Sequence, residues 1–200
     1  MTSFISARAN DLLTIGHSNL PAGRFMALLK QADVTAIADV RSVPFSRWWP
    51  WFSQKALAER LVAERIRYIA LGDALGGRPR ERQLYRDGVA DYEAMAATPR
   101  FRAGLEQLAK EIARHRVCLL CAEREPLDCH RCLLVGRALA QRGLAPGHIR
   151  ADGTIEPHAE TEERLLELAG READLFHDRA ARLADAYRRR ARAVAARLKV

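Results

Sequence analysis

Short, wholly apolar runs of strand length alternate along this chain with segments whose apolar residues recur at helical spacing. Residues 117–121 read VCLLC, for example, whereas residues 54–66 place Leu57 and Leu61 on one helical face. Strands without polar alternation are typical of parallel sheets that are buried on both faces. We therefore predict an α/β fold with a single, mainly parallel sheet and helices on both of its faces. The predicted strands are residues 12–15, 35–40, 67–71, 117–121 and 148–149.

Helices are predicted where the apolar spacing changes to that of a helix. Pro99 stands at a position that can open one of them, and Gly143 at a position that can end another. Residues 72–82 are rich in glycine and arginine and are predicted to form a loop. The predicted helices are one opened by Pro21, then residues 54–66, 89–97, 101–114 and 129–142, and the segment from residue 160 onward.

The composition changes near residue 160, where a highly charged helical segment begins. Between Arg179 and Val200 there are eight Arg and Lys residues and a single acid, Asp185. Much of the net charge of +8 therefore belongs to this tail and says little about the rest of the chain. We predict an α/β domain at residues 1–158 and a helical, basic extension at residues 159–200.

The sequence lacks the features of a secreted or membrane protein. No apolar run approaches the roughly 20 residues that cross a bilayer. The N-terminal stretch MTSFISARANDLLTIG lacks the long apolar core of a secretory signal. All four cysteines lie between Cys118 and Cys132, and clustered cysteines without a signal are typical of a reducing compartment. We expect a cytoplasmic protein with no membrane partner.

Polar residues follow several predicted strands at their carboxyl ends, which is the edge where open α/β sheets bind ligands. His17 follows the first strand, Asp39 ends the second, and Glu123 follows the fourth. The fourth strand also leads through a charged loop to a predicted helix start at Cys129, and a helix N-terminus favours anions. We expect these segments to form one site. The candidate catalytic residues are Cys121, Glu123, Cys129, His130, His17 and Asp39, and the candidate substrate-binding residues are Ser18, Arg41, Ser42, Arg47, Arg78 and Arg131.

The cysteines allow more than one kind of chemistry. Cys118-x2-Cys121 followed by Cys129-x2-Cys132 has the pattern of a four-thiolate zinc or iron–sulfur site. On a strand, however, Cys118 and Cys121 point to opposite faces. Cys118 and Cys132 are therefore interpreted as core residues, and no metal ligand or cofactor is predicted. Cys129 lies beside His130 near a helix start, which favours a thiolate, and Cys121 lies at the strand end across the loop. Either thiol is a candidate nucleophile, with Glu123 or His17 as its base. Simple packing of both site thiols is the alternative.

Arginines and aromatic residues indicate the class of partner. Guanidinium groups close to strand ends suit phosphate, so the expected partner is a phosphate-bearing small molecule or a nucleotide. The segment 45–52, FSRWWPWF, has a composition that can stack on bases. The basic tail can bind nucleic acid through phosphate contacts. A hydrophobic knot and a solvated basic helix are the simpler interpretations of these two segments.

Five short motifs occur in order along the chain. They are TIGHSN at residues 14–19, IADVRSVP at 37–44, SR at 46–47, LGGR at 75–78, and C-A-E…P…C-H-R between Cys121 and Arg131. Over residues 12 to 150 the chain resembles the family called domain of unknown function 488. The resemblance implies an α/β fold with a shared polar site at the sheet edge, and it supplies no reaction. The last motif is also similar to a segment of proteins that cleave N-glycosidic bonds of nucleotide metabolites, which is an analogy only.

These observations favour an enzyme over a binding module. We expect a hydrolase or transferase that acts on a phosphorylated or nucleotide-like substrate at the Cys/His/Glu/Arg site. One alternative is a nucleic-acid-binding module that uses the basic tail and the tryptophan cluster. The other is a thiolate metal protein with zinc or an iron–sulfur cluster.

Overall fold

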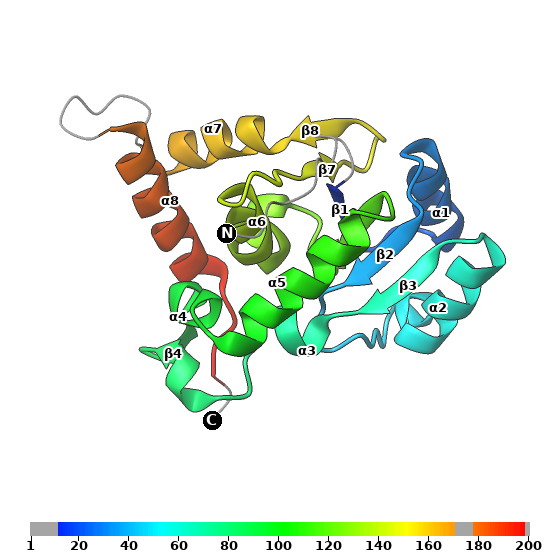
Figure 1. Ribbon diagram of the computed structural model, residues 1–200, viewed down its shortest axis with the longest axis horizontal. Helices are drawn as coiled ribbons and strands as arrows, with labels where there is room; N and C mark the ends of the chain where they lie inside the picture. Colours follow the sequence, from blue (N-terminus) through cyan, green and yellow to red (C-terminus); the bar gives the residue numbers. More distant parts are fainter. Residues whose placement is uncertain (1–11, 171–177, 199–200) are drawn as a thin grey trace.

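A six-stranded sheet lies at the centre of the protein in the computed structural model, which describes residues 12–170 and 178–198. The strand order is β3-β2-β6-β1-β7-β8, and every pair is parallel except β7 with β8 (Figure 1). The predicted fold class is therefore confirmed. The strands are β1 Leu12–Gly16, β2 Ala36–Asp39, β3 Arg67–Ala70, β6 Val117–Cys121, β7 Gly147–Ile149 and β8 Ile155–Pro157.

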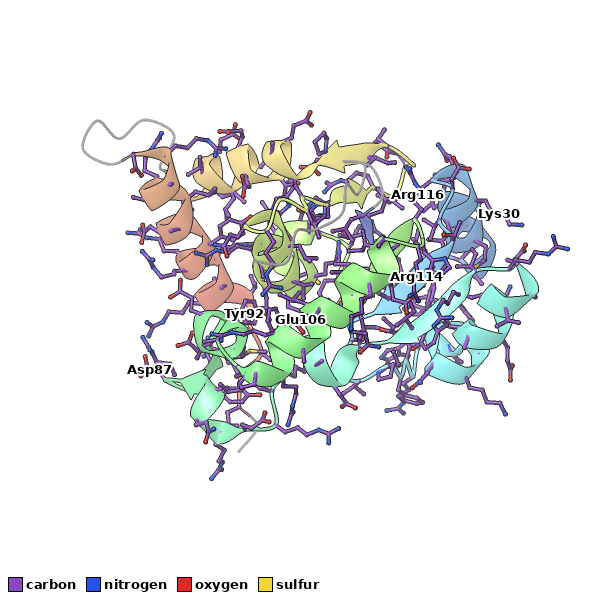
Figure 2. The ribbon with its side chains drawn as sticks, in the orientation of Figure 1. Lys30, Asp87, Tyr92, Glu106, Arg114 and Arg116 are labelled. Atoms are coloured by element: carbon purple, nitrogen blue, oxygen red, sulfur yellow. The ribbon has the colours of Figure 1, made fainter. Side chains whose placement is uncertain are left out.

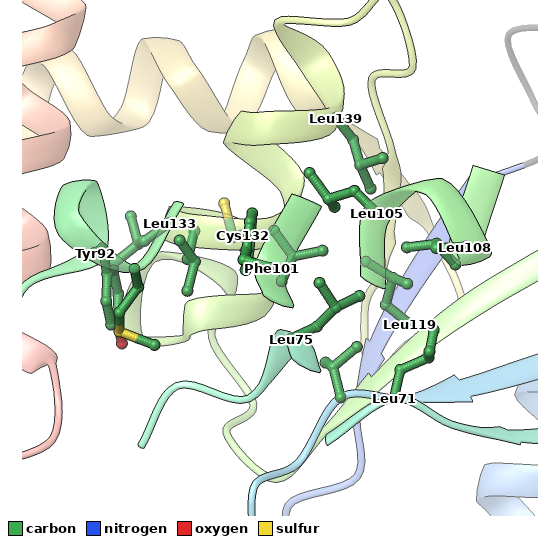
Figure 3. Close-up of a cluster of buried hydrophobic side chains, with 14 of the residues drawn as sticks. Leu71, Leu75, Tyr92, Phe101, Leu105, Leu108, Leu119, Cys132, Leu133 and Leu139 are labelled. Carbon is green, nitrogen blue, oxygen red and sulfur yellow. The ribbon is translucent and has the colours of Figure 1, made fainter. Parts of the chain in front are cut away.

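Helices cover both faces of the sheet, as its apolar strands require. On β6, Cys118 and Leu120 face one way and pack with α1 (Ala22–Gln31) and α2 (Gln54–Ala63). Leu119 faces the other way and packs with α5 (Pro99–Ile112), in the cluster that Figure 3 shows. The remaining helices are α3 Gly72–Leu75, α4 Tyr92–Ala96, α6 Arg137–Ala140, α7 His158–Leu168 and α8 Arg179–Val194.

Polar residues set several helix boundaries and cover the outside of the molecule. Thr98 accepts a hydrogen bond from the backbone of Phe101 at the start of α5, directly before Pro99. Lys30 and Glu106 lie on exposed helix faces (Figure 2). None of the described helices is long and apolar enough to cross a membrane. The N-terminal stretch on which the signal prediction rests lies largely outside the described residues, at positions 1–11.

Three predicted boundaries are wrong. The predicted helix at residues 89–97 begins instead with a short strand, β5 (Val89–Ala90), because these residues pair with β4 (Tyr85–Arg86) across an Asp-Gly turn. The predicted loop at residues 72–82 contains the helix α3. The predicted helix at residues 129–142 starts as a π-helix, Arg131–Gly136, which continues into α6. Strand β8 was not predicted.

The C-terminal helices pack against the same core as the sheet. Leu165 of α7 and Tyr187 of α8 are buried in the apolar cluster that includes Leu119 of β6. After α8 the chain runs beside the β4–β5 hairpin, where the carbonyl of Ala196 accepts a hydrogen bond from Ala90. The division of the chain at residues 158 and 159 stays a prediction. Residues 171–177 and 199–200 of the predicted tail lie outside the described residues.

Candidate active site

The ends of β1, β6 and β2 meet at one edge of the sheet because these strands are neighbours in register. Gly16 pairs with Cys121, and Asp39 pairs with Leu120. The loops that follow stay in contact, since the backbone N–H of His17 donates to the Cys121 carbonyl at 2.9 Å. A Cβ atom on Gly16 would lie 1.7 Å from the Glu123 carbonyl oxygen, so only glycine allows the loop after β6 to lie this close.

A cavity of about 400 Å³ opens at this edge. Seven of the twelve predicted site residues line it: His17, Arg41, Ser42, Arg78, Cys121, Glu123 and His130. Cys129 and Arg131 lie buried behind this wall, and Asp39 is buried against Arg41. Ser18 and Arg47 are not among the lining residues. The predicted convergence of segments far apart in sequence therefore holds for most of the predicted set.

Four side chains converge tightly on the inner wall of this cavity. The Sγ atoms of Cys121 and Cys129 lie 2.8 and 3.1 Å from the same Glu123 carboxylate oxygen, Oε2. The same two sulfurs lie 3.6 and 3.9 Å from Nδ1 of His130. We call Cys121, Glu123, Cys129 and His130 the thiol cluster. It combines two thiols, a carboxylate and an imidazole within one small volume.

The imidazole of His130 is held from behind. Its Nε2–H donates to the Val40 carbonyl at 2.8 Å, which leaves Nδ1 facing the sulfurs. Gly77 packs directly on the ring, where a Cβ atom would lie 2.6 Å from Cγ of His130. The second glycine of the LGGR motif is therefore explained by close packing on a site residue.

Electrostatics give the two thiols opposite properties. Burial disfavours ionisation of Cys129, but the neighbouring Cys121 thiol, the charge of Arg131 and His130 outweigh it and hold the pKa of Cys129 well below its ordinary value. Burial and the adjacent Cys129 raise the pKa of Cys121 well above its ordinary value. Burial lowers the pKa of His130, but Cys129 and Glu123 more than reverse this effect. Of the two thiols, Cys129 is therefore the one that ionises more readily.

Arg131 organises the loop that carries the cluster. Its side chain is only 1% exposed, and its guanidinium donates to the carbonyls of Glu123 and Arg124 at 2.5 and 2.8 Å. Its Nε–H also points to the Thr14 hydroxyl at 3.4 Å. These contacts direct its N–H groups into the protein rather than into the cavity.

A second network of hydrogen bonds and an ion pair fixes Arg41 in the wall of the cavity. Asp39 receives a two-pronged ion pair from Arg41, and the Tyr68 hydroxyl donates to the same carboxylate at 2.7 Å. Arg41 also donates to the Phe52 carbonyl and to Nε2 of His17, at 2.7 and 3.2 Å. His17 donates from Nδ1 to the carbonyl of Ser18, so both of its nitrogens have partners. Burial, aided by the charge of Arg41, lowers the pKa of His17 to about 4.

The other predicted cations differ in their availability. In the part of the chain that the structure describes, the guanidinium of Arg78 has no acidic partner and faces the cavity, while its backbone N–H donates to Ser42. Arg47 instead lies over the ring of Trp48, 5.5 Å from its centroid. Arg78 is thus the lining arginine best placed to bind an anionic ligand.

The four cysteines do not share one metal site. Cys118 and Cys132 are fully buried, on opposite sides of the sheet, and only Cys121 and Cys129 belong to the thiol cluster. Within the described residues a second group has metal-binding potential, formed by Cys132, His148 and His158. The thiol cluster could hold a metal ion through two sulfurs, one nitrogen and one oxygen.

The second group is instead a saturated hydrogen-bond chain. His148 contacts the Thr14 hydroxyl at 2.8 Å and Nδ1 of His158 at 3.0 Å, and Nε2 of His158 contacts the Tyr187 hydroxyl at 3.1 Å. All four nitrogens of His148 and His158 therefore have a hydrogen-bond partner. The Tyr187 hydroxyl in turn donates to the Glu162 carboxylate. Burial lowers the pKa of His158 to about 4 and that of His148 well below its ordinary value, so both imidazoles are neutral at pH 7.

Stability is expected to fall as the pH drops from 6.5 to 4. His17 and His158 both have a pKa near 4 in the folded state, against 6.5 when exposed, so between these pH values the unfolded chain binds more protons. Each pKa shift corresponds to a loss of about 3 kcal/mol in the free energy of unfolding across this pH interval. Urea unfolding at pH 7 and pH 4.5 measures this loss. His158→Gln should make the pH dependence shallower, and a free energy of unfolding that stays constant over this interval would contradict the assignment of neutral, buried histidines.

Several lining residues were not predicted. Tyr92 lies at the start of α4, and Val194 and Ala196 come from the end of α8 and the segment after it. No local pattern indicates that the tail reaches the cavity, because this contact depends on tertiary packing. Asp128 and Phe45 also line the cavity. Both could have been predicted, because Asp128 directly precedes Cys129 and Phe45 directly follows the IADVRSVP motif.

The basic tail is largely neutralised within the molecule. Within the described residues, at least five basic residues of the tail form ion pairs with acids. Arg190 pairs with Asp128 and donates to the Leu127 carbonyl, which fixes α8 to the loop before Cys129. The paired residues are Arg179, Arg188, Arg189, Arg190 and Arg192.

Fold and site together define an α/β protein with a polar cavity and a buried thiol cluster at the carboxyl ends of its parallel strands. The family described as "Domain of unknown function DUF488" matches residues 21–138, which is more than half of the chain. The protein therefore belongs to this family, and the predicted resemblance is confirmed. No curated protein and no solved structure matches the chain.

Proposed function

We propose that the protein is an enzyme, a hydrolase or transferase, that acts on a small phosphorylated or nucleotide-like substrate bound in the cavity. The observation that carries this proposal is the position of the thiol cluster. Cys121, Glu123 and His130 face a cavity of about 400 Å³, at the sheet edge where α/β enzymes bind their ligands. A buried group of titratable side chains that opens onto a cavity is typical of catalytic sites.

Glu123 is the best candidate for acid–base chemistry. It is partly exposed, lines the cavity, and contacts both sulfurs through one oxygen. His17 is a weaker candidate, because its Nε2 already accepts from Arg41 and its pKa of about 4 leaves it a weak base. Asp39, Arg41 and Arg131 serve as positioning residues in this proposal, since their side chains are buried in ion pairs and hydrogen bonds.

The cavity mouth supports a nucleotide-like substrate. Phe45 and Trp48 are 68% and 77% exposed, and Phe45 lines the cavity. An exposed aromatic ring beside an unpaired arginine offers stacking for a base and a charge-assisted hydrogen bond for a phosphate. Trp49 and Trp51 pack instead against the apolar core, so only part of the tryptophan segment is available for stacking.

The tail arginines give less support to a nucleic-acid-binding module. Arg189 pairs with Asp185 on its own helix, and Arg190 and Arg192 pair with Asp128 and Asp87. A guanidinium that already has a carboxylate partner loses this contact when it turns to a phosphate, and this loss reduces the gain from binding. We therefore retain the enzyme as the favoured function.

Arg78→Ala and Phe45→Ala should distinguish phosphate binding from stacking of the base. We expect Arg78→Ala to weaken both inorganic phosphate and AMP by about 10- to 100-fold, the worth of a charge-assisted hydrogen bond. Phe45→Ala should weaken AMP by about tenfold, through lost stacking, and leave phosphate unchanged. Isothermal titration calorimetry measures all of these affinities.

Arg80→Ala is the matched control for these variants. Arg80 lies two positions from Arg78, pairs with Asp73, and does not line the cavity, so its removal should leave both affinities unchanged. Equal losses in Arg78→Ala and Arg80→Ala would indicate only general electrostatics. The proposed substrate class would be contradicted if the wild-type protein bound none of these ligands: inorganic phosphate, AMP, nucleoside diphosphates and sugar phosphates.

A further inference from the structure

We propose that the thiol cluster binds one zinc ion, held by Cys121, Cys129 and His130 with Glu123 in the fourth position. The four ligand atoms all lie within 4.8 Å of one another. Two sulfurs, an imidazole nitrogen and a carboxylate oxygen form a set that favours zinc among the biological divalent ions. The site differs from the four-thiolate pattern of the sequence, because Cys118 and Cys132 are not among its ligands.

The separations between the two sulfurs and the imidazole nitrogen are close to those of a tetrahedral site. Zn–S bonds of about 2.3 Å and a Zn–N bond of about 2.0 Å place sulfur and nitrogen about 3.5 Å apart in tetrahedral geometry. The Sγ atoms of Cys121 and Cys129 lie 3.6 and 3.9 Å from Nδ1 of His130. The Glu123 oxygen lies nearer to the sulfurs, at 2.8 and 3.1 Å, and the ion therefore requires the carboxylate to withdraw slightly towards the cavity.

Neighbouring groups orient two of the ligand side chains through hydrogen bonds and packing, as is usual around bound metal ions. The Nε2–H of His130 donates to the Val40 carbonyl, which directs Nδ1 at the sulfurs. The backbone N–H of Arg131 points at Sγ of Cys129 at 3.4 Å, a contact that stabilises a thiolate. Gly77 packs on the imidazole and fixes its orientation. The imidazole of His130 and the Cys129 sulfur are thus held in place before any ion enters.

Charge balance supports a divalent ion. Two thiolates and one carboxylate bring three negative charges, so a zinc ion leaves one, and the buried guanidinium of Arg131 supplies the compensating positive charge. In contrast to this cluster, the chain of His148, His158 and Tyr187 uses its nitrogens for hydrogen bonds and leaves none free for a metal.

The cavity gives the ion an entry path and a use. Cys121, Glu123 and His130 line it, whereas Cys129 lies behind them. Glu123 is the ligand nearest to solvent, so its position is the one that a water molecule or a substrate oxygen can take. The catalytic use of the ion rests on the function proposed above, in which zinc would polarise a phosphate oxygen or bound water next to the freed carboxylate.

Metal analysis of the purified full-length protein tests this inference. The protein is expressed in zinc-supplemented medium without a polyhistidine tag, dialysed against metal-free buffer and measured by plasma mass spectrometry. We expect one zinc per chain. Cobalt substitution should produce an intense thiolate-to-cobalt charge-transfer band, and X-ray absorption at the zinc edge should show two sulfur ligands. These two readouts need no variant and do not depend on how well a variant folds.

Cysteine variants provide the matched comparison. Cys129→Ala should lose the stoichiometric metal, whereas Cys118→Ala, which removes a core thiol of the same strand-and-loop region, should keep it. Circular dichroism confirms that each variant is folded. A wild-type protein without metal, a cobalt spectrum unchanged by Cys129→Ala, or stoichiometric iron in place of zinc would each overturn the inference.

The outcomes distinguish this inference from the proposed function. If zinc is bound but neither inorganic phosphate nor AMP binds, the zinc site stands and the proposed function fails. If the wild type holds no metal but turns over a phosphorylated substrate in a Glu123-dependent reaction, the proposed function stands and the zinc site fails.

Discussion

Glu123→Gln is expected to lower turnover by about 10²- to 10⁴-fold, the range that a positioned acid–base group contributes. The amide keeps the shape of the side chain but cannot accept a proton or carry a negative charge. Glu123 contacts both cluster sulfurs and faces the cavity, so the loss should appear in kcat more than in substrate affinity. The measurement is steady-state kinetics on a substrate identified among nucleoside phosphates and sugar phosphates.

Glu106→Gln serves as the control for this variant. Glu106 is exposed on α5 and does not line the cavity, so its replacement should leave kcat within a few-fold of wild type. A Glu123→Gln protein that keeps the wild-type kcat would contradict the role of this carboxylate. A raised KM with an unchanged kcat would show that Glu123 only binds the substrate.

Arg131→Met is expected to lower the free energy of unfolding by about 3–5 kcal/mol, as the loss of a buried, hydrogen-bonded charge does. Methionine fills much of the volume but leaves the carbonyls of Glu123 and Arg124 without their donors. The thiol cluster also loses the positive charge that holds the pKa of Cys129 low. Denaturant unfolding at pH 7 measures the effect.

Arg124→Met provides the comparison within the same loop. Arg124 is exposed, and its side chain donates a hydrogen bond to Asn19, so its removal should change stability by no more than about 0.5 kcal/mol. Similar losses in both variants would show that Arg131 is an ordinary loop residue rather than the residue that organises the site.

Much of the fold followed from the apolar pattern because the central strands are buried on both faces. Residues 117–121 were predicted as a strand and form β6, and the alternation of Cys118 and Leu119 between two cores follows directly from strand geometry. Strand β8 was missed because it is a three-residue edge strand that ends in proline and has no distinct pattern. The helix predicted at Val89 overlooked the Asp87-Gly88 turn that pairs this residue with Arg86, and its other partner, Arg197, is set by tertiary packing.

The site was predictable to the extent that it follows strand ends. Glu123 and His130 were expected near His17 because parallel neighbours end at the same edge, and all three line the cavity. Sequence alone could not show which arginines are free, since Arg131 and Arg78 occur in equally basic motifs but only Arg131 is buried. Nor could it show that the end of α8 closes part of the cavity.

The central claim is that a phosphorylated ligand meets the thiol cluster inside this cavity. Backbone amide NMR of the Glu123→Gln protein, titrated with AMP, tests it most directly, because the variant retains the cavity and turns over slowly. We expect the largest shift changes at Gly77, Arg78 and Ala122, which line the cavity. Changes confined to the outer residues of α8, such as Arg189, or no changes at all, would contradict the account.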